Sequence, residues 1–412
     1  MRLSQICTAA AVSMLNASGR ALGPLGRHMP DLTPESLRLR AQRRGGLTEF
    51  GSWPIDEPLA RLMEAYEREA NLTMLGRLTV RELIVSLLEN LLYLEQEREA
   101  SPRVERQVIA RPVFIVGLPR TGTTLLHGLI AQDPANRTPL TWEVMYPAGF
   151  DETEIGLRRA KRRTAARLAW ADRLVPGLQR VHPIGPELPQ ECVALMAQAF
   201  ASPEFHTIYG VPSYQDWYER NGQGLAFDMH YRMLQQLQAR RGTRRWVLKA
   251  PAHLFGLAPL VNRYPDARLI HTHRDPVRVL PSIASLNTLL RRAFSHDADP
   301  RDIAADWCVR WARALEGFLA ARDRSPPERF LDIHYEAIVG SPLETTERIY
   351  EFLGWRLSET AREKMTVFLA RNPKNKHGAH HYSLAEFGLD RETERKRYTD
   401  YCERFQIPVS DA

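Results

Sequence analysis

A glycine-containing loop between two apolar segments carries the clearest chemical signal in the sequence. Residues 112–127 read PVFIVGLPRTGTTLLH: an apolar, β-branched run that stops at Gly117, a polar turn, and the apolar start of a helix. A strand, a tight loop and a helix N-terminus together direct several backbone N–H groups and the positive end of the helix toward one small volume. The sequence therefore predicts a site for a phosphate-like anion.

The spacing of this loop is that of the nucleotide loop G-x-x-x-x-G-K-[ST], with one change. Gly117 and Gly122 are correctly separated and Thr124 occupies the Ser/Thr position, but Thr123 stands where the lysine should be. In NTPases that lysine reaches the β- and γ-phosphates. Arg120, inside the loop, offers a fixed charge with bidentate geometry instead. We expect an anion shorter than a triphosphate; the alternative is an ordinary βα turn with two spare glycines.

Two more groups that could bind anions or charged intermediates follow predicted strands. Lys249 ends one strand. Arg274 follows another, and Ser282 lies two turns into the helix that Asp275 and Pro276 should begin. Ligands of open α/β sheets bind at the carboxyl ends of the strands, so we expect these groups to converge with the loop. Two anion sites without a magnesium-binding carboxylate motif indicate a nucleotide that is phosphorylated at both ends.

Strands and helices alternate along the chain from residue 111 onward. The predicted strands are residues 113–116, 245–249, 267–272 and 330–334. Such alternation predicts a P-loop-like, three-layer α/β fold in which helices flank a mostly parallel central sheet. We divide the chain into a helical N-terminal extension, residues 1–110, and an α/β domain, residues 111–412, with a helical insertion at about 151–240.

Composition and charge are those of an ordinary globular protein with anionic ligands. The chain has 412 residues, 44% hydrophobic and 25% charged, and a formal net charge of +7, too mild to indicate nucleic acid. Much of the excess charge lies at 158–167, which we interpret as a solvated helix face.

No C-x-x-C pair occurs among the four cysteines, Cys7, Cys192, Cys308 and Cys402. No segment of the sequence approaches the length of a membrane span. We expect a cytoplasmic location.

Three motifs, in this order, resemble those of sulfotransferases that use 3′-phosphoadenosine 5′-phosphosulfate. They are GLPRTGTTL at 117–125, WVLKAP at 246–251, and HRDP at 273–276 with Ser282, and the later Tyr335-Glu336 and Phe352-Leu-Gly354 also fit. The resemblance is to the bacterial branch that is similar to tyrosylprotein and carbohydrate sulfotransferases, and it extends from about residue 112 to the C-terminus. It implies an enzyme that moves a sulfuryl group from this nucleotide to an acceptor hydroxyl by in-line displacement, without a metal.

The resemblance also implies which residues hold the nucleotide. The 5′-phosphosulfate would be held by Arg120, Thr121, Gly122, Thr123 and Thr124. The 3′-phosphate would be held by Arg274 and Ser282. A late basic loop that contains Lys376, His377 and Gly378 would close over the nucleotide.

The group that takes the proton of the acceptor hydroxyl is less clearly marked. Lys249 falls where the family places a lysine near the transferring group, but the catalytic histidine that follows it by two residues in the cytosolic branch is here Pro251. In the tyrosylprotein branch the base is a glutamate after the first helix, and Glu143 lies nearest that place, offset by about two residues. We rank Glu143 first, His253 second and Glu191 third as the general base.

The sequence leaves two other functions open. A P-loop kinase or NTPase would need a lysine at position 123 and a separate magnesium-binding acid, and the sequence shows neither clearly. A non-enzymatic basic anion-binding protein would rest on the 158–167 run, which carries no recognisable nucleic-acid motif.

Proline-broken segments at 182–191 and 209–218 are typical of acceptor pockets. The acceptor itself remains open among small-molecule, carbohydrate, lipid and peptide hydroxyls.

Overall fold

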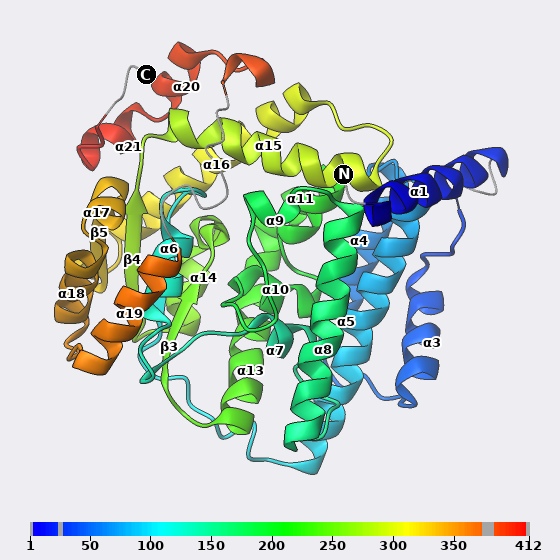
Figure 1. Ribbon diagram of the computed structural model, residues 1–412, viewed down its shortest axis with the longest axis horizontal. Coiled ribbons are helices and arrows are strands. Elements are labelled where there is room, and N and C mark those ends of the chain that lie inside the picture. The colour runs from blue at the N-terminus through cyan, green and yellow to red at the C-terminus, as the bar shows by residue number, and fades with distance from the viewer. Residues whose placement is uncertain (1–2, 24–27, 373–382, 409–412) are drawn as a thin grey trace.

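A five-stranded parallel sheet lies at the centre of the computed structural model, which describes residues 3–23, 28–372 and 383–408 (Figure 1). The strands are β1 (Val113–Val116), β2 (Asn136–Arg137), β3 (Arg245–Lys249), β4 (Arg268–His273) and β5 (Phe330–His334). Their order is β2-β3-β1-β4-β5, and every neighbouring pair is parallel. The predicted α/β fold with a parallel sheet is therefore confirmed.

The central strand β1 aligns the carboxyl ends of its neighbours. Ile115 lies opposite Lys249 of β3 and opposite Ile270 of β4, so the loops that follow these three strands open at one edge of the sheet. All four residues of β1 are buried and apolar, as expected for a strand that is covered on both faces. Strand β2 was not predicted, because two residues at a sheet edge are too short to give a periodic signal.

Two apolar layers cover the two faces of the sheet. Phe114 and Val116 join the larger hydrophobic cluster, whereas Val113 and Ile115 join a second cluster that includes Ile349. This alternation follows from the two-residue period of a strand. Figure 1 shows the corresponding arrangement, with α17 (Tyr335–Gly340), α18 (Pro342–Leu353) and α19 (Glu359–Arg371) on one side of the sheet and most of the other helices on the opposite side.

Four helices precede the sheet within the described residues 3–23 and 28–112. They are α1 (Leu3–Ala21), α3 (Pro34–Gly45), α4 (Asp56–Arg68) and α5 (Met74–Ala100). Thr73 caps α5 by accepting a hydrogen bond from the backbone N–H of Gly76 at 3.0 Å. Ile84 of α5 belongs to the same hydrophobic cluster as Phe114 of β1. The N-terminal helices thus share a core with the sheet, and the domain boundary at residue 110 stays a prediction.

A group of helices separates β1 from β3. They are α6 (Thr123–Ile130), α7 (Thr141–Met145), α8 (Glu154–Leu174), α9 (Leu178–Val181), α10 (Cys192–Met196), α11 (Glu204–Tyr209), α12 (Pro212–Trp217) and α13 (Gln223–Arg241). A helical region begins close to the predicted position 151 and ends at Arg241. Helix α8 is largely exposed, because only Ala160 and Thr164 among its residues are buried.

The remaining helices follow β3, β4 and β5. They are η3 (Pro251–Phe255), α14 (Leu257–Arg263), α15 (Pro276–Phe294), α16 (Pro300–Asp323), α20 (Arg391–Arg397) and α21 (Thr399–Arg404), besides α17, α18 and α19. Asp275 caps α15 by accepting a hydrogen bond from the N–H of Val277 at 3.0 Å, and Pro276 lies in its first turn, as predicted. Within the described residues, no helix has both the length and the apolar character that a membrane crossing requires.

Candidate active site

The loop between β1 and α6 has a backbone shape that only glycine accommodates at two positions. Gly117 has φ +147°, and a β-carbon there would lie 2.4 Å from Thr272 Oγ1. Gly122, at the N-cap of α6, has φ +89°. Arg120 is exposed and adopts a left-handed φ of +67°, a conformation that costs a non-glycine residue energy and often marks a functional site. The loop is therefore a tight cradle at the start of α6, in agreement with the sequence.

The threonines of the cradle differ in burial. Thr121 is buried, and its Oγ1 lies 2.7 Å from the carbonyl oxygen of Leu118 and 2.6 Å from Thr272 Oγ1. Its hydroxyl thus fastens the loop to β4, which leaves its backbone N–H for a ligand. Thr123 is buried as well, whereas Thr124 is exposed at the open edge of the sheet.

A buried ion pair lies beside the cradle. Lys249, at the end of β3, has a side chain that is only 3% exposed, and its Nζ donates to Thr124 Oγ1 at 3.3 Å and to Glu191 Oε1. Burial, the largest single effect, raises the pKa of Glu191, but the charge and hydrogen bond of Lys249 together with the nearby His182 and His127 lower it more and hold it below its usual range. Glu191 is therefore an ionised carboxylate, 19% exposed, at the anion loop.

The segment that carries Glu191 is fixed against the start of α7. The N–H of Thr141 donates to the carbonyl of Leu188 at 3.1 Å, and the N–H of Gln190 donates to the carbonyl of Pro139 at 2.7 Å. These bonds place the proline-broken segment 182–191 next to β3, although it is distant in sequence. The sequence ranked Glu191 third because no local pattern marks this pairing.

Two histidines that were not predicted as site residues surround the ion pair. Burial lowers the pKa of His182, and the charges of Lys249 and Arg120 lower it further against the opposing effect of Glu191. Burial also lowers the pKa of His127 to about 3. Both imidazoles are neutral at neutral pH. His127 ends the 112–127 stretch and His182 begins the segment 182–191, but neither belongs to a residue pattern that assigns it a role.

A second carboxylate, Glu204, is electrostatically coupled to Glu191. Its backbone N–H donates to Ser202 Oγ at 3.2 Å, and this hydroxyl donates to the carbonyl of Val193 at 2.9 Å, two residues after Glu191. Burial and the charge of Glu191 raise the pKa of Glu204 to about 7. Glu191 and Glu204 therefore differ in protonation at neutral pH, with Glu191 ionised and Glu204 partly protonated.

The second predicted anion position is joined to the first by a direct hydrogen bond. Arg274 Nη1 donates to the carbonyl oxygen of Arg120 at 2.8 Å, and its guanidinium lies over the ring of Tyr335, 3.8 Å from the centroid. Burial lowers the pKa of Arg274. Ser282 lies partly exposed on α15, the helix that begins directly after Arg274. The end of β4 and the cradle thus form one continuous cationic surface.

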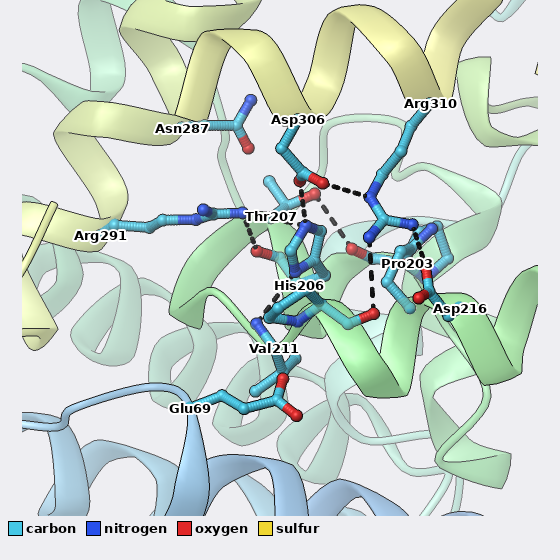
Figure 2. A network of polar contacts seen from close by, with 12 residues as sticks. Glu69, Pro203, His206, Thr207, Val211, Asp216, Asn287, Arg291, Asp306 and Arg310 are labelled. Carbon is cyan, nitrogen blue, oxygen red and sulfur yellow. Dashed lines mark hydrogen bonds and ion pairs between the residues drawn. The ribbon is translucent and has the colours of Figure 1, made fainter. Parts of the chain in front are cut away.

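A polar network fixes the position of α15. Figure 2 shows Arg291 of α15 donating to the carbonyl of His206 (2.8 Å), whose Nε2 lies 2.7 Å from Asp306 Oδ2 of α16. Arg310 donates to the same Asp306 at 2.8 Å and to Asp216 of α12 at 2.7 Å. Burial lowers the pKa of His206 to about 4 despite its bond to Asp306. The network fastens α15 and α16 to α11 and α12.

Both carboxylate oxygens of Glu143, which we ranked first as the base, accept hydrogen bonds from nearby residues. Its Oε1 accepts from Arg137 at 3.1 Å and its Oε2 accepts from the N–H of Leu140 at 3.1 Å, and its side chain is 6% exposed. Arg137 also donates to the carbonyl of Gly242, just before the amino end of β3, whereas the cradle lies at the carboxyl edge of the sheet. These contacts give Glu143 a structural role.

His253, ranked second, is fully buried below the sheet edge. Its ring packs against Phe114 (centroids 5.2 Å apart) and Phe227 (5.5 Å), and neither ring nitrogen has a hydrogen-bond partner among the described residues. Burial holds its pKa well below the usual value. The imidazole is therefore packed within the hydrophobic core. The remaining predicted residues, Lys376, His377 and Gly378, lie outside the described residues.

One cluster contains the residue types that bind metal ions, but its carboxylate is already paired with an arginine. His271, His273 and Asp332 bring one possible ligand atom each within 4.8 Å of the others. However, Arg322 donates to both oxygens of Asp332 at 2.7 Å, and His273 Nε2 lies 2.9 Å from Asp332 Oδ1. The guanidinium already neutralises the carboxylate, so this cluster is an internal ion-pair network.

Comparison with known proteins gives a consistent assignment. A model of the sulfotransferase family matches residues 112–359. The chain is 32% identical to the sulfotransferase STF1 from Mycobacterium tuberculosis H37Rv, with 89% of this chain and 98% of that chain covered and a TM-score of 0.78. For STF9 from Mycobacterium avium the identity is 25%, the coverage 92% and 98%, and the TM-score 0.82.

A third relative carries a more specific name. The chain is 28% identical over 305 residues to the omega-hydroxy-beta-dihydromenaquinone-9 sulfotransferase Stf3 of Mycobacterium tuberculosis (strain CDC 1551 / Oshkosh), which covers 69% of this chain and 74% of the relative. The structural matches confirm the P-loop-like fold with its parallel sheet. With the family model, they show that this chain belongs to the sulfotransferase family, whose general activity is sulfuryl transfer from 3′-phosphoadenosine 5′-phosphosulfate.

Proposed function

We propose that this enzyme sulfates the hydroxyl of a lipid-type small molecule, with Glu191 as the general base and Lys249 as the cation beside the transferring group. The observation that carries the proposal is the Lys249–Glu191 ion pair, which lies against Thr124 of the anion cradle. An ionised carboxylate and a buried cation at one strand end supply the two charges that a displacement at a sulfuryl group requires.

The residues of the cradle fit the donor nucleotide. A loop with no room for a β-carbon at Gly117 and a positive φ at Gly122, at the N-terminus of α6, suits close approach by an anionic group. Arg120, Gly122, Thr123, Thr124 and the backbone N–H of Thr121 would hold the 5′-phosphosulfate. When bound, the donor supplies an activated sulfuryl group whose leaving group is 3′,5′-bisphosphoadenosine.

The second end of the nucleotide would be held at the end of β4. Arg274 and Ser282 would bind the 3′-phosphate, and the predicted loop of Lys376, His377 and Gly378 would add cationic contacts. Arg274 is held by the carbonyl of Arg120, so its side chain is oriented before a ligand arrives. Because the chain supplies these cations itself, the proposal includes no metal.

Glu191 replaces Glu143 and His253 as the base in this proposal. Its carboxylate is ionised, keeps partial exposure and lies at the cradle, whereas Glu143 binds Arg137 and His253 is enclosed. Glu191 takes the proton of the acceptor hydroxyl as the new oxygen–sulfur bond forms and the bond to the leaving phosphate breaks. Lys249 neutralises the negative charge that develops on the oxygen of the leaving group.

The acceptor class rests on the relative Stf3, whose name gives a hydroxylated menaquinone as its substrate. An apolar acceptor also suits the segment 182–191, in which Leu188 is 44% exposed. The described cysteines Cys192, Cys308 and Cys402 are free thiols, which suits the reducing cytoplasm that we propose as the location.

Thermal unfolding with nucleotides tests the donor assignment. We expect 3′,5′-bisphosphoadenosine to raise the Tm without magnesium, whereas stabilisation only by ATP with magnesium would indicate a kinase or NTPase. Incubation of the enzyme and sulfur-labelled donor with a lipid extract then tests the acceptor class. Label in an organic-phase product supports it, and label only in carbohydrate or peptide fractions contradicts it.

A further inference from the structure

Helix α8 presents a long, exposed face that the proposed reaction does not use. It contains seven cationic residues and two acidic ones, a net charge of +5 for the helix. Only Ala160 and Thr164 among its 21 residues are buried. Ile155 and Trp170, near its two ends, are 71% and 56% exposed. An exposed helix that combines high positive charge with large apolar side chains is unusual on a protein surface.

Five of the exposed side chains of α8 lie along one stripe. Ile155, Arg159, Arg162, Trp170 and Arg173 are separated by intervals of 4, 3, 8 and 3 residues, which place them on one side of an α-helix. We call this set the α8 stripe. Its apolar members, Ile155 and Trp170, lie on either side of Arg159 and Arg162.

The cations of α8 divide into paired and unpaired groups. Arg158 is paired with Glu154 at 2.9 Å, and Arg167 donates to Ser86 at 2.8 Å. By contrast, no partner of Arg159 or Arg162 occurs anywhere in residues 3–23, 28–372 and 383–408. The charges of Arg159 and Arg162 are therefore available to an external anion, whereas Arg173 lies over the ring of Trp170, 5.6 Å from its centroid.

Helix α8 is also connected to the segment that carries the proposed base. Lys161 pairs with Glu187, four residues before Glu191, and Leu188 beside it is 44% exposed. Figure 1 places α8 on the outside of the helical group, next to α5. Helix α1, which contacts α8, adds the exposed Met14. A partner bound along α8 would lie beside the segment 182–191.

We propose that the α8 stripe binds the surface of a membrane that contains anionic lipids. The cations would contact lipid headgroups, and Ile155 and Trp170 would insert their apolar side chains at the boundary of the acyl chains. This inference goes beyond the proposed function and does not depend on the acceptor. If the acceptor is lipid-borne, binding along α8 would bring it to the segment 182–191.

A membrane fits the stripe better than a nucleic acid does. The phosphate backbone of a duplex would pair with Arg159 and Arg162 but would leave Ile155 without an apolar contact. A membrane surface satisfies both kinds of side chain at once. Each cation near an anionic membrane surface strengthens binding about fivefold.

Cosedimentation with lipid vesicles tests the proposal on the full-length protein. We expect the wild type to bind vesicles that contain phosphatidylglycerol more tightly than vesicles of phosphatidylcholine alone. The double variant Arg159→Ala/Arg162→Ala should bind the anionic vesicles about 30-fold more weakly. Trp170→Ser should weaken binding to both kinds of vesicle.

The matched control is Arg348→Ala/Arg356→Ala, which removes two exposed cations at and after α18, on the other side of the sheet. It should bind vesicles like the wild type. The Tm shift with 3′,5′-bisphosphoadenosine should be unchanged in all variants, so a failure of the donor assignment would be seen separately. Equal vesicle binding by the α8 double variant and the control would overturn the proposal, as would tighter binding to duplex DNA than to anionic vesicles at the same salt concentration.

Discussion

Lys249 and Glu191 form a buried ion pair although 58 residues separate them in the sequence. The lysine ends β3 at the open edge of the sheet, and the glutamate precedes α10 at the end of a proline-broken segment. Their contact brings the proposed acceptor segment to the anion cradle. It also helps to keep Glu191 ionised, because the charge and hydrogen bond of Lys249, together with His182 and His127, lower the pKa of that carboxyl by more than burial raises it.

Glu191→Gln should lower kcat by about 10²–10⁴-fold, because the amide cannot take the proton of the acceptor hydroxyl. The binding of 3′,5′-bisphosphoadenosine should not weaken, since Glu191 is not among the groups that hold the nucleotide. Steady-state sulfation and calorimetric titration measure the two quantities. A normal kcat in this variant would exclude Glu191 as the base.

Glu143→Gln should mainly affect stability. The substitution leaves Arg137, whose side chain is 7% exposed, without its charged partner. Loss of one partner of a buried pair typically lowers the free energy of unfolding by about 3 kcal/mol. Urea unfolding measures this loss, and kcat at a temperature well below the Tm should change only a few-fold. A large loss of kcat in the folded variant would return Glu143 to the first rank as the base.

Gly117→Ala should abolish stabilisation by 3′,5′-bisphosphoadenosine. The added methyl group would lie 2.4 Å from Thr272 Oγ1, and the residue would have to keep φ at +147°. Gly340→Ala is the matched control, because a β-carbon at Gly340 meets no atom within 4 Å. The measurement is the Tm with and without the nucleotide. An equal nucleotide shift in both variants would show that the cradle does not hold the donor.

Stability should fall as the pH rises toward 7 because of Glu204. The pKa of this carboxyl is raised to about 7 by burial and by the charge of Glu191. In the unfolded chain the group loses its proton at about pH 4.3, so between these values the folded state holds more protons and loses stability with increasing pH. Glu204→Gln should remove this loss and raise the free energy of unfolding at pH 8 by about 1–2 kcal/mol, after allowance for solvent screening. Urea unfolding at pH 5 and pH 8 measures it, and an unchanged pH dependence would contradict the assignment.

His206 should make the protein less stable at acidic pH. Burial lowers its pKa to about 4, whereas the unfolded chain takes up a proton at about pH 6.5. The unfolded state therefore binds more protons between these values, and the free energy of unfolding should fall by about 1.4 kcal/mol per pH unit from this group as the pH decreases. His206→Gln should reduce the slope by that amount. An identical slope in wild type and variant would show that burial does not hold His206 neutral.

The sequence by itself determined the features that depend on local spacing. Apolar runs with defined ends located β1, β3 and β5 at their observed residues, and two glycines five positions apart identified the cradle. Lys249 and Arg274 were placed at the sheet edge because each directly follows a run that packs as a parallel strand. These inferences hold because strand periodicity, turn geometry and helix capping act within a few residues of the chain.

Only the tertiary structure decided which carboxylate lies at the cradle. Glu143 is close to the position that the family pattern suggests, but Arg137 and the N–H of Leu140 occupy its oxygens. Aromatic packing encloses His253. From its place shortly after the end of β3 alone, the residue would be expected to be open to the site. Glu191 reaches Lys249 because backbone bonds hold the segment 182–191 against α7. Contacts between distant segments fix the burial and the charge of each carboxylate, and no local pattern in the sequence records them.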